Sequence, residues 1–179
     1  MMALLVIDMQ VGLVDGEPLY RKVETLKTIQ TVLAQARTAS VPIFYMQDVD
    51  VGGVGTPDFE IHSSVHPLAN EPVIVKTEAD SFYETDLHEQ LQAQDIDTLV
   101  IVGLKTEYCV DATVRRAYEL GYKVYLVADG HTTTDRDYMT AAQVVQHHNW
   151  LLACIGTDDL YNEVIPAAQV TFSEPTVIE

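Results

Sequence analysis

The chain has 179 residues, of which 47% are hydrophobic, and this size and balance suit one domain with a substantial core. Its formal net charge of −17 argues against nucleic-acid binding, because a negative field repels the phosphate backbone. No apolar run approaches the roughly 20 residues of a membrane-spanning helix, and the first ten residues lack the features of a signal peptide. We therefore predict a cytoplasmic protein in which Cys109 and Cys154 are free thiols.

Short apolar runs alternate with a helical pattern in the first half of the chain. Apolar side chains recur at helical spacing over residues 20–39, which predicts a helix. Residues 52–67 contain three glycines and two prolines with little periodicity, so we predict a loop there. The strands expected in this half are residues 4–7, 42–47 and 72–76.

The same alternation continues in the second half. Helices are expected over residues 86–94, 109–120 and 137–149. The apolar run that contains Cys154 predicts a last strand and a small core thiol. The strands expected here are residues 98–102, 123–128 and 152–155.

This order of elements predicts the fold class. Continuously apolar strands that alternate with helices indicate a parallel sheet covered on both faces. We expect an α/β protein, a Rossmann-like three-layer sandwich with a mainly parallel sheet of about six strands. No repeat or linker divides the chain, so we predict a single domain over residues 1–179. In such folds the functional site lies outside the carboxyl ends of the strands.

Three reactive side chains follow expected strands at that edge. Asp8 follows the first strand, Lys76 ends the third, and Cys109 begins a helix shortly after the fourth. A helix N-terminus stabilises a thiolate, so we expect the pKa of Cys109 to be well below its ordinary value. Asp8 would exchange the proton, and Lys76 would hold the two negative groups together. The competing interpretations are a turn-capping carboxylate, a solvated lysine and a structural thiol.

The strand ends also carry a family resemblance. The segments are Leu5-Val6-Ile7-Asp8-Met9-Gln10, the isolated Lys76, Val102-Gly103-Leu104-Lys105-Thr106-Glu107-Tyr108-Cys109-Val110, and Val127-Ala128-Asp129-Gly130 with Asp135 beyond. In this order and spacing, and over nearly the whole chain, they resemble the isochorismatase-like cysteine hydrolase family.

The resemblance implies a function and a set of roles. It implies a cysteine-dependent hydrolase of a C–N bond in a small molecule, with a thioester on Cys109, Asp8 as acid and base, and Lys76 as their electrostatic partner. It implies an oxyanion hole made by the backbone N–H groups of Lys105 and Cys109, and a cis peptide bond between Leu104 and Lys105. It further implies a homodimer or homotetramer and no cofactor.

Further residues are candidates for the substrate pocket. Gln10 would bind substrate, support Asp8 or only form a turn. Leu13, Phe82, Tyr83 and Tyr108 are candidates for its wall, although such residues more often belong to a core. Lys105 stands where the family often has a small residue, and its side chain would enter the pocket or point to solvent.

A metal site is not expected. His62 and His66 lie in the loop beyond Asp48, which by itself suggests metal ligands. The nicotinamidase branch of the family binds its metal through an Asp-x-His pair after the second strand. Residues 47–51 read Gln-Asp-Val-Asp-Val and lack this pair, so we predict no metal.

Two other functions compete with C–N bond hydrolysis. The first is an isochorismatase-type vinyl-ether hydrolase that uses Asp8 and Lys76 and releases pyruvate by acid catalysis. The presence of Cys109 and the charge of −17 argue against it, because isochorismate is a dianion. The second is a non-catalytic module that keeps the fold only for binding, and an unreactive Cys109 would favour it.

Overall fold

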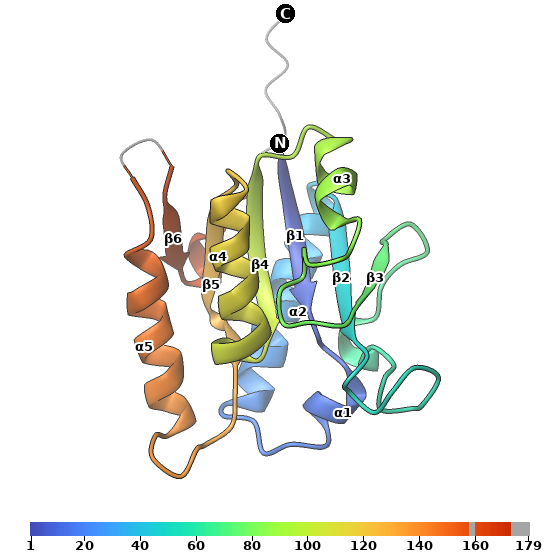
Figure 1. The fold of residues 1–179 in the computed structure, drawn as a ribbon, viewed down its shortest axis with the longest axis vertical. Helices are drawn as coiled ribbons and strands as arrows, with labels where there is room; N and C mark the ends of the chain where they lie inside the picture. Colours follow the sequence, from blue (N-terminus) through green and yellow to red (C-terminus); the bar gives the residue numbers. More distant parts are fainter. Residues whose placement is uncertain (158–159, 173–179) are drawn as a thin grey trace, which may run out of the picture.

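A computed structural model describes residues 1–157 and 160–172 of the chain (Figure 1). Six strands form one all-parallel sheet in the order β3-β2-β1-β4-β5-β6. The predicted α/β fold class is confirmed. The strands are β1 (Met2–Ile7), β2 (Ile43–Asp48), β3 (Val73–Lys76), β4 (Thr98–Leu104), β5 (Lys123–Thr132) and β6 (Asn162–Ile165).

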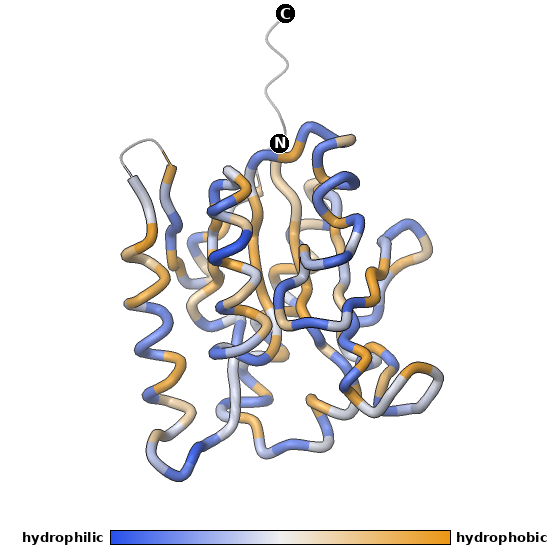
Figure 2. The backbone as a smooth tube through the Cα atoms, viewed as in Figure 1, coloured by the Kyte–Doolittle hydropathy of each residue, from blue (hydrophilic) through white to orange (hydrophobic). Residues whose placement is uncertain are grey.

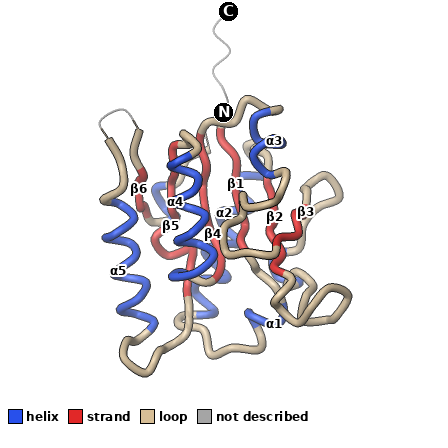
Figure 3. Tube along the Cα trace, viewed as in Figure 1, coloured by secondary structure: helices blue, strands red, loops and turns tan. Residues whose placement is uncertain are grey.

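Helices cover both faces of this sheet (Figures 1 and 3). The helix α2 (Lys22–Thr38) packs on one face together with the short helical turn Ala167–Gln169. On the opposite face lie α3 (Leu87–Gln92), α4 (Asp111–Glu119) and α5 (Ala141–Ala153). No helix of the described residues is long and apolar enough to cross a membrane.

The centre of the sheet is β1, because its residues are apolar on both sides. Ala3 through Ile7 are completely buried. Leu5 and Ile7 face the core under α3 and α4, whereas Leu4 and Val6 face the core under α2. Figure 2 shows hydrophobic residues along the central strands, while α5 alternates between hydrophobic and polar residues as expected for a surface helix.

The last predicted strand is wrong. Residues 151–153 complete α5, and β6 is formed later by Asn162–Ile165. A short apolar run does not by itself distinguish a buried strand from the end of a helix, and here only Leu152 of that run is fully buried. Cys154 consequently caps α5 as an exposed thiol, with its Sγ 3.2 Å from the Trp150 carbonyl oxygen, and is not part of the core.

Two further segments differ from the prediction. A short helix α1 (Val11–Val14) follows β1 at the carboxyl edge of the sheet. The helix expected from residue 109 begins as a π-helical turn over Thr106–Val110 and continues as α4. A π-helical turn in this position widens the backbone around the candidate nucleophile, and such turns are frequent at functional sites.

Gly103 allows β4 to approach β1 closely at this edge. Its φ is +132°, and a Cβ built on it would lie 2.1 Å from the backbone oxygen of Ile7. We expect Gly103→Ala to lower the free energy of unfolding by roughly 3 kcal/mol or more, because neither backbone can give way. Gly53→Ala is the matched control, since Gly53 also has a positive φ, +82°, but has no neighbour within 4 Å. It should cost about 1 kcal/mol in urea denaturation. Equal losses of unfolding free energy in the two variants would show that the close contact of Gly103 with Ile7 does not contribute to the cost.

Candidate active site

Four side chains meet where the strands end. Asp8 follows β1, Asp48 ends β2, Lys76 ends β3, and Cys109 lies in the π-helical turn after β4. Lys76 Nζ lies 3.0 Å from Asp8 Oδ2, 2.6 Å from Asp48 Oδ2 and 3.4 Å from Cys109 Sγ. The structure therefore brings Asp8, Lys76 and Cys109 into one cluster around the lysine ammonium.

Asp8 is held in a strained position at the end of β1. Its φ is +48°, its N–H donates to the Met46 carbonyl oxygen at 3.2 Å, and its carboxyl group is fully buried. Burial raises the pKa of Asp8 to about 6, and the lowering effect of Lys76 does not cancel this. A carboxyl group with such a pKa can both accept and return a proton near neutral pH.

Lys76 has its donors committed inside the protein. Its Nζ donates to Asp48 Oδ2 at 2.6 Å and to the Glu78 carbonyl oxygen at 3.0 Å, and it forms an ion pair with Asp8. Burial on its own would lower the pKa of Lys76, but the Asp8 carboxylate, the neighbouring Cys109 and the hydrogen bond to Asp48 raise it above its ordinary value. The lysine is therefore a permanent cation at the centre of the cluster.

The expected low pKa of Cys109 is wrong. Burial raises the pKa of this thiol well above its ordinary value, and the neighbouring carboxylate of Asp8 adds to the effect, against the opposing influence of Lys76. A helix N-terminus alone would lower the pKa of a thiol, but here burial and Asp8 have the larger effect. Asp48 Oδ2 also lies 3.9 Å from Sγ. At rest the site thus pairs a neutral thiol with a carboxylate that can remove its proton.

The sequence prediction did not include Asp48 in this cluster. It was considered only as a metal ligand in the following loop. Asp48 is the register partner of Lys76 in the β2–β3 ladder, and adjacent residues in parallel strands point the same way. The available signal was that Asp48 ends one strand and Lys76 ends another. This signal can be used only when the strand order is known, because that order makes the two strands neighbours.

Gln10 supports the end of β2 and does not line the cavity. Its side-chain amide donates to the carbonyl oxygens of Asp48 and Phe59, both at 3.0 Å, and accepts the Asp48 N–H at 2.8 Å. The side chain is fully buried. Of the roles open for Gln10, the structure favours a supporting one, directed at Asp48 and not at Asp8.

A cavity of about 330 Å³ opens above the cluster, a volume suited to a small molecule. Of the residues expected at the pocket wall, Leu13 and Tyr108 line this cavity, whereas Phe82 and Tyr83 do not. Phe82 is buried and stacks on Tyr122, with ring centroids 5.9 Å apart, and Tyr83 is exposed. Sequence alone did not indicate which way these aromatic side chains point. The lining residues are Asp8, Leu13, Asp48, Asp50, Val51, Thr77, Glu78, Ala79, Lys105, Tyr108 and Cys109.

Lys105 contributes both its backbone and its side chain. The peptide bond between Leu104 and Lys105 is cis. The Lys105 N–H has no hydrogen-bond acceptor among the described residues, so it is free to donate to a ligand. The side chain lines the cavity, and its Nζ lies 2.5 Å from Glu17 Oε2, which neutralises its charge.

The two loop histidines do not join the cluster. His62 Nδ1 contacts the Ser64 hydroxyl at 2.7 Å, and His62 Nε2 lies 3.2 Å from Asp15 Oδ2. Among the described residues, the carboxylate and thiol atoms of Asp8, Asp48 and Cys109 are close enough to share an ion, but the Lys76 ammonium lies among them. The Lys76 ammonium thus already occupies the position among these three side chains. The absence of a metal remains a prediction.

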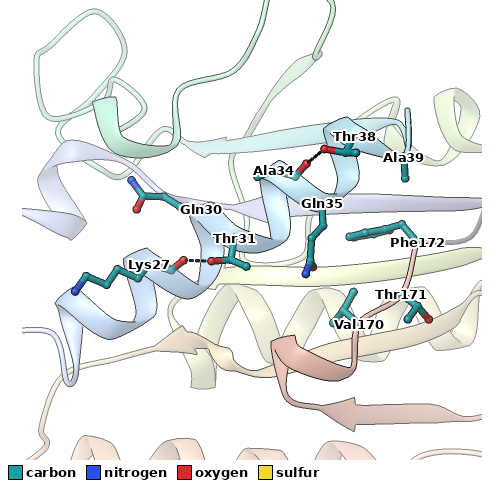
Figure 4. A pocket seen from close by; sticks show the side chains of 10 residues that line it. All are labelled: Lys27, Gln30, Thr31, Ala34, Gln35, Thr38, Ala39, Val170, Thr171 and Phe172. Carbon is teal, nitrogen blue, oxygen red and sulfur yellow. Dashed lines mark hydrogen bonds between the residues drawn. The ribbon is translucent and has the colours of Figure 1, made fainter.

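A larger cavity lies elsewhere and has a different character. It measures about 1030 Å³ and is formed by the outer side of α2 and residues 170–172 (Figure 4). Among the described residues that line it, Lys27 is the one ionisable group, and none carries a thiol or a carboxylate. This cavity therefore lacks the thiol and carboxylates that line the smaller one.

A buried histidine supports the turn that carries Cys109, and the sequence prediction missed its role. His131 contacts the Thr106 hydroxyl at 2.9 Å through Nδ1 and the Asn149 side-chain oxygen at 2.8 Å through Nε2. Burial lowers the pKa of His131 to about 4. Because β5 extends to Thr132, this histidine lies within the sheet and not in the loop after it.

The lowered pKa of His131 predicts a pH-dependent stability. The ordinary pKa is 6.5, so the folded protein binds fewer protons than the unfolded chain between pH 6.5 and 4. The neutral His131 contributes fully to the free energy of unfolding above pH 6.5. This contribution is lost as the pH falls towards 4, and the total loss is about 3 kcal/mol. We expect the difference in unfolding free energy between wild type and His131→Asn to shrink between pH 7 and 4.5. A difference independent of pH would contradict a neutral, buried His131.

Fold and site together define an α/β protein in which a half-buried cysteine meets a buried aspartate and lysine at the carboxyl edge of a parallel sheet. The chain belongs to the isochorismatase family: the Isochorismatase domain matches residues 2–153. The predicted family resemblance is confirmed.

Relatives and solved structures agree with this assignment. Streptothricin hydrolase from Streptomyces noursei is 36% identical, over 97% of this chain and 65% of its own length, so the chain spans less than two thirds of that relative. Ureidoacrylate amidohydrolase from Agrobacterium fabrum is 25% identical over 82% of this chain and 79% of its own length. A crystal structure of an isochorismatase from Pseudomonas putida KT2440 is 30% identical, with a TM-score of 0.84, and the match covers 94% and 89% of the two chains.

Proposed function

We propose that the chain is a hydrolase that cleaves a C–N bond of a small amide, carbamoyl or cyclic imide through a thioester on Cys109. The observation that carries the proposal is the cluster in which a nucleophilic sulfur, a buried carboxyl group with a pKa near 6 and a fixed ammonium meet at one cavity. Two relatives named for hydrolysis, streptothricin hydrolase and ureidoacrylate amidohydrolase, support the reaction class.

The first half of the proposed reaction forms the thioester. Asp8 accepts the thiol proton as Cys109 Sγ attacks the carbonyl carbon, which gives a tetrahedral intermediate. The free N–H of Lys105 and the N–H of Cys109 are the proposed donors to its oxyanion. The C–N bond then breaks, and Asp8 returns the proton to the leaving nitrogen, which departs as an amine or ammonia.

The second half releases the acid. Water attacks the thioester carbon while Asp8 accepts one of its protons, the C–S bond breaks, and the thiolate regains the proton from Asp8. Lys76 stays protonated throughout and offsets the negative charge that moves between sulfur and carboxylate. No cofactor or metal is needed for these steps. The prediction of a homodimer or homotetramer, and that of a cytoplasmic protein, both remain predictions.

The cluster disfavours the vinyl-ether alternative. Isochorismate is a dianion, and a site for it needs cations free to bind carboxylates. The Lys76 ammonium is ion-paired with Asp8 and Asp48 and donates to the Glu78 carbonyl oxygen, and Lys105 is paired with Glu17. A non-catalytic binding role does not explain why the nucleophile Cys109 lies beside Asp8, a carboxyl group that can exchange a proton near neutral pH.

A substrate panel distinguishes these functions. We expect release of ammonia or amine from some of a set of small primary amides, ureido compounds and cyclic imides, and no release of pyruvate from isochorismate. Pretreatment with iodoacetamide, located on Cys109 by peptide mapping, should abolish the release. Pyruvate formation from isochorismate that survives this alkylation would support the vinyl-ether reaction. If the protein also released no ammonia or amine from any compound of the panel, C–N bond hydrolysis would be refuted.

A further inference from the structure

The cavity above Cys109 has an excess of negative side chains. Four carboxylates line it, those of Asp8, Asp48, Asp50 and Glu78. Among the described residues, two lysine cations reach it, Lys76 at its base and Lys105 on its wall, while Arg136, over the ring of Tyr108, is ion-paired with Glu107. Whether this imbalance selects a substrate depends on how many of these charges are already paired inside the protein.

Both cations are already paired. Lys76 is shared by the carboxylates of Asp8 and Asp48, so one positive charge faces two negative ones. Lys105 is neutralised by Glu17 at 2.5 Å. Within residues 1–157 and 160–172, the cavity therefore has no cation left to bind an anionic group of a ligand.

Asp50 and Glu78 are the unpaired carboxylates. Both side chains are exposed at the mouth of the cavity, and neither forms an ion pair or hydrogen bond with any residue in 1–157 or 160–172. Both are nevertheless anchored through their backbones to the buried cluster. The Asp50 N–H donates to Asp48 Oδ1 at 2.9 Å, and the Glu78 carbonyl oxygen accepts from Lys76 Nζ at 3.0 Å.

A second feature of the cavity also calls for a hydrogen-bond donor. Asp8 is fully buried and lines the cavity, yet its Oδ1 accepts no hydrogen bond from any described residue. A buried carboxylate oxygen without a partner is costly, and a ligand N–H would satisfy it. The cavity thus offers acceptors both at its base and at its mouth.

We infer that the substrate of this site carries a cationic nitrogen, an ammonium or guanidinium group, which lies between Asp50 and Glu78 while the scissile carbonyl lies at Cys109. The inference rests on the proposed function for the position of the carbonyl. Charge-assisted hydrogen bonds to these two carboxylates would select a cationic amide over a neutral or anionic one of the same shape. Asp50 and Glu78 are then specificity-determining residues.

The test measures the potential at Cys109 with two thiol reagents that differ in charge. Aminoethyl methanethiosulfonate is a cation and sulfonatoethyl methanethiosulfonate an anion. With each, the sulfur forms a mixed disulfide and displaces methanesulfinate. Rates are measured with EDTA in a Cys154→Ser background, which removes the exposed second thiol, and are divided by the rates with free 2-mercaptoethanol. The ratio of the two rates cancels any change in the thiolate fraction of Cys109.

We expect the cationic reagent to be favoured at least about tenfold. Asp50→Asn with Glu78→Gln should return the ratio to within about threefold of one. The matched control, Glu89→Gln with Asp137→Asn, removes the same total charge at exposed positions away from the cavity and should change the ratio less than about twofold.

Two results would overturn the inference. One is a ratio near one, or below it, in the wild type. The other is an equal fall in the ratio for both double variants, which would assign the effect to the overall charge of −17. The reagents report the potential whether or not an amide is hydrolysed, so failure of the proposed reaction and failure of the cationic substrate class are separate outcomes.

Discussion

Replacing Cys109 by alanine is expected to lower kcat/KM for C–N bond cleavage by at least ~10³-fold, because the thioester can no longer form. The fold should tolerate the change, since Cys109 is only half-buried and lies in a turn anchored by the Lys105 carbonyl oxygen and by His131. The measurement is steady-state release of the amine, with thermal unfolding as a check on folding.

Two control variants strengthen this prediction. Cys154→Ala removes a thiol that is exposed and remote from the cavity, and it should leave kcat/KM unchanged. Cys109→Ser keeps a hydroxyl nucleophile of much lower reactivity and should lose nearly as much activity as the alanine variant. Activity in Cys109→Ala within tenfold of the wild type would assign the reaction to acid catalysis by Asp8 without a covalent intermediate.

The second large effect is expected from Asp8→Asn, which removes the proton acceptor but keeps the shape of the side chain. We expect kcat/KM to fall by about 10²–10⁴-fold, the usual contribution of a general base. In the wild type, kcat/KM should rise with pH through the pKa of Asp8 near 6, since only the carboxylate accepts the thiol proton. In the asparagine variant the residual activity should lose this rising limb.

Stability measurements separate this effect from misfolding. The pKa of Asp8 is about 6 in the folded protein against an ordinary value of 3.8, so the folded state binds more protons over that window. Stability contributed by this group is present at low pH and decreases as the pH rises through the window. Asp8→Asn removes that pH-dependent loss of stability. Because Lys76 keeps Asp48 as an ion-pair partner, the variant should remain folded at pH 7. Lost activity in a variant that is markedly less stable at pH 7 would contradict the assigned role.

The sequence predicted those parts of the fold that depend on local pattern. Apolar runs such as residues 3–7 mark buried parallel strands, and the ends of those strands directed attention to Asp8, Lys76 and Cys109. The last strand failed because the run around Leu152 is apolar without being a strand, while β6 contains Asn162 and Glu163 and has little pattern of its own.

The parts of the site that were missed depend on contacts between distant segments. Asp48 acquires its role from its register with Lys76, and Asp50 from the direction in which the chain leaves β2. The raised pKa of Cys109 depends on burial and on the Asp8 carboxylate from another strand, which no spacing along the chain reveals. Likewise, the core position of Phe82 depends on Tyr122, 40 residues away in the sequence.

The central claim is that Cys109 carries the acyl group during turnover. Its most direct test is to mix the enzyme with an excess of an amide that it hydrolyses and to quench the mixture with acid within milliseconds. Intact-protein mass spectrometry and peptide mapping then detect and locate any covalent adduct. We predict a mass increase equal to the acyl portion, located on the peptide that contains Cys109 and absent from Cys109→Ala. Release of the amine at an undiminished rate by Cys109→Ala, with no adduct on the wild type at any time, would contradict the claim.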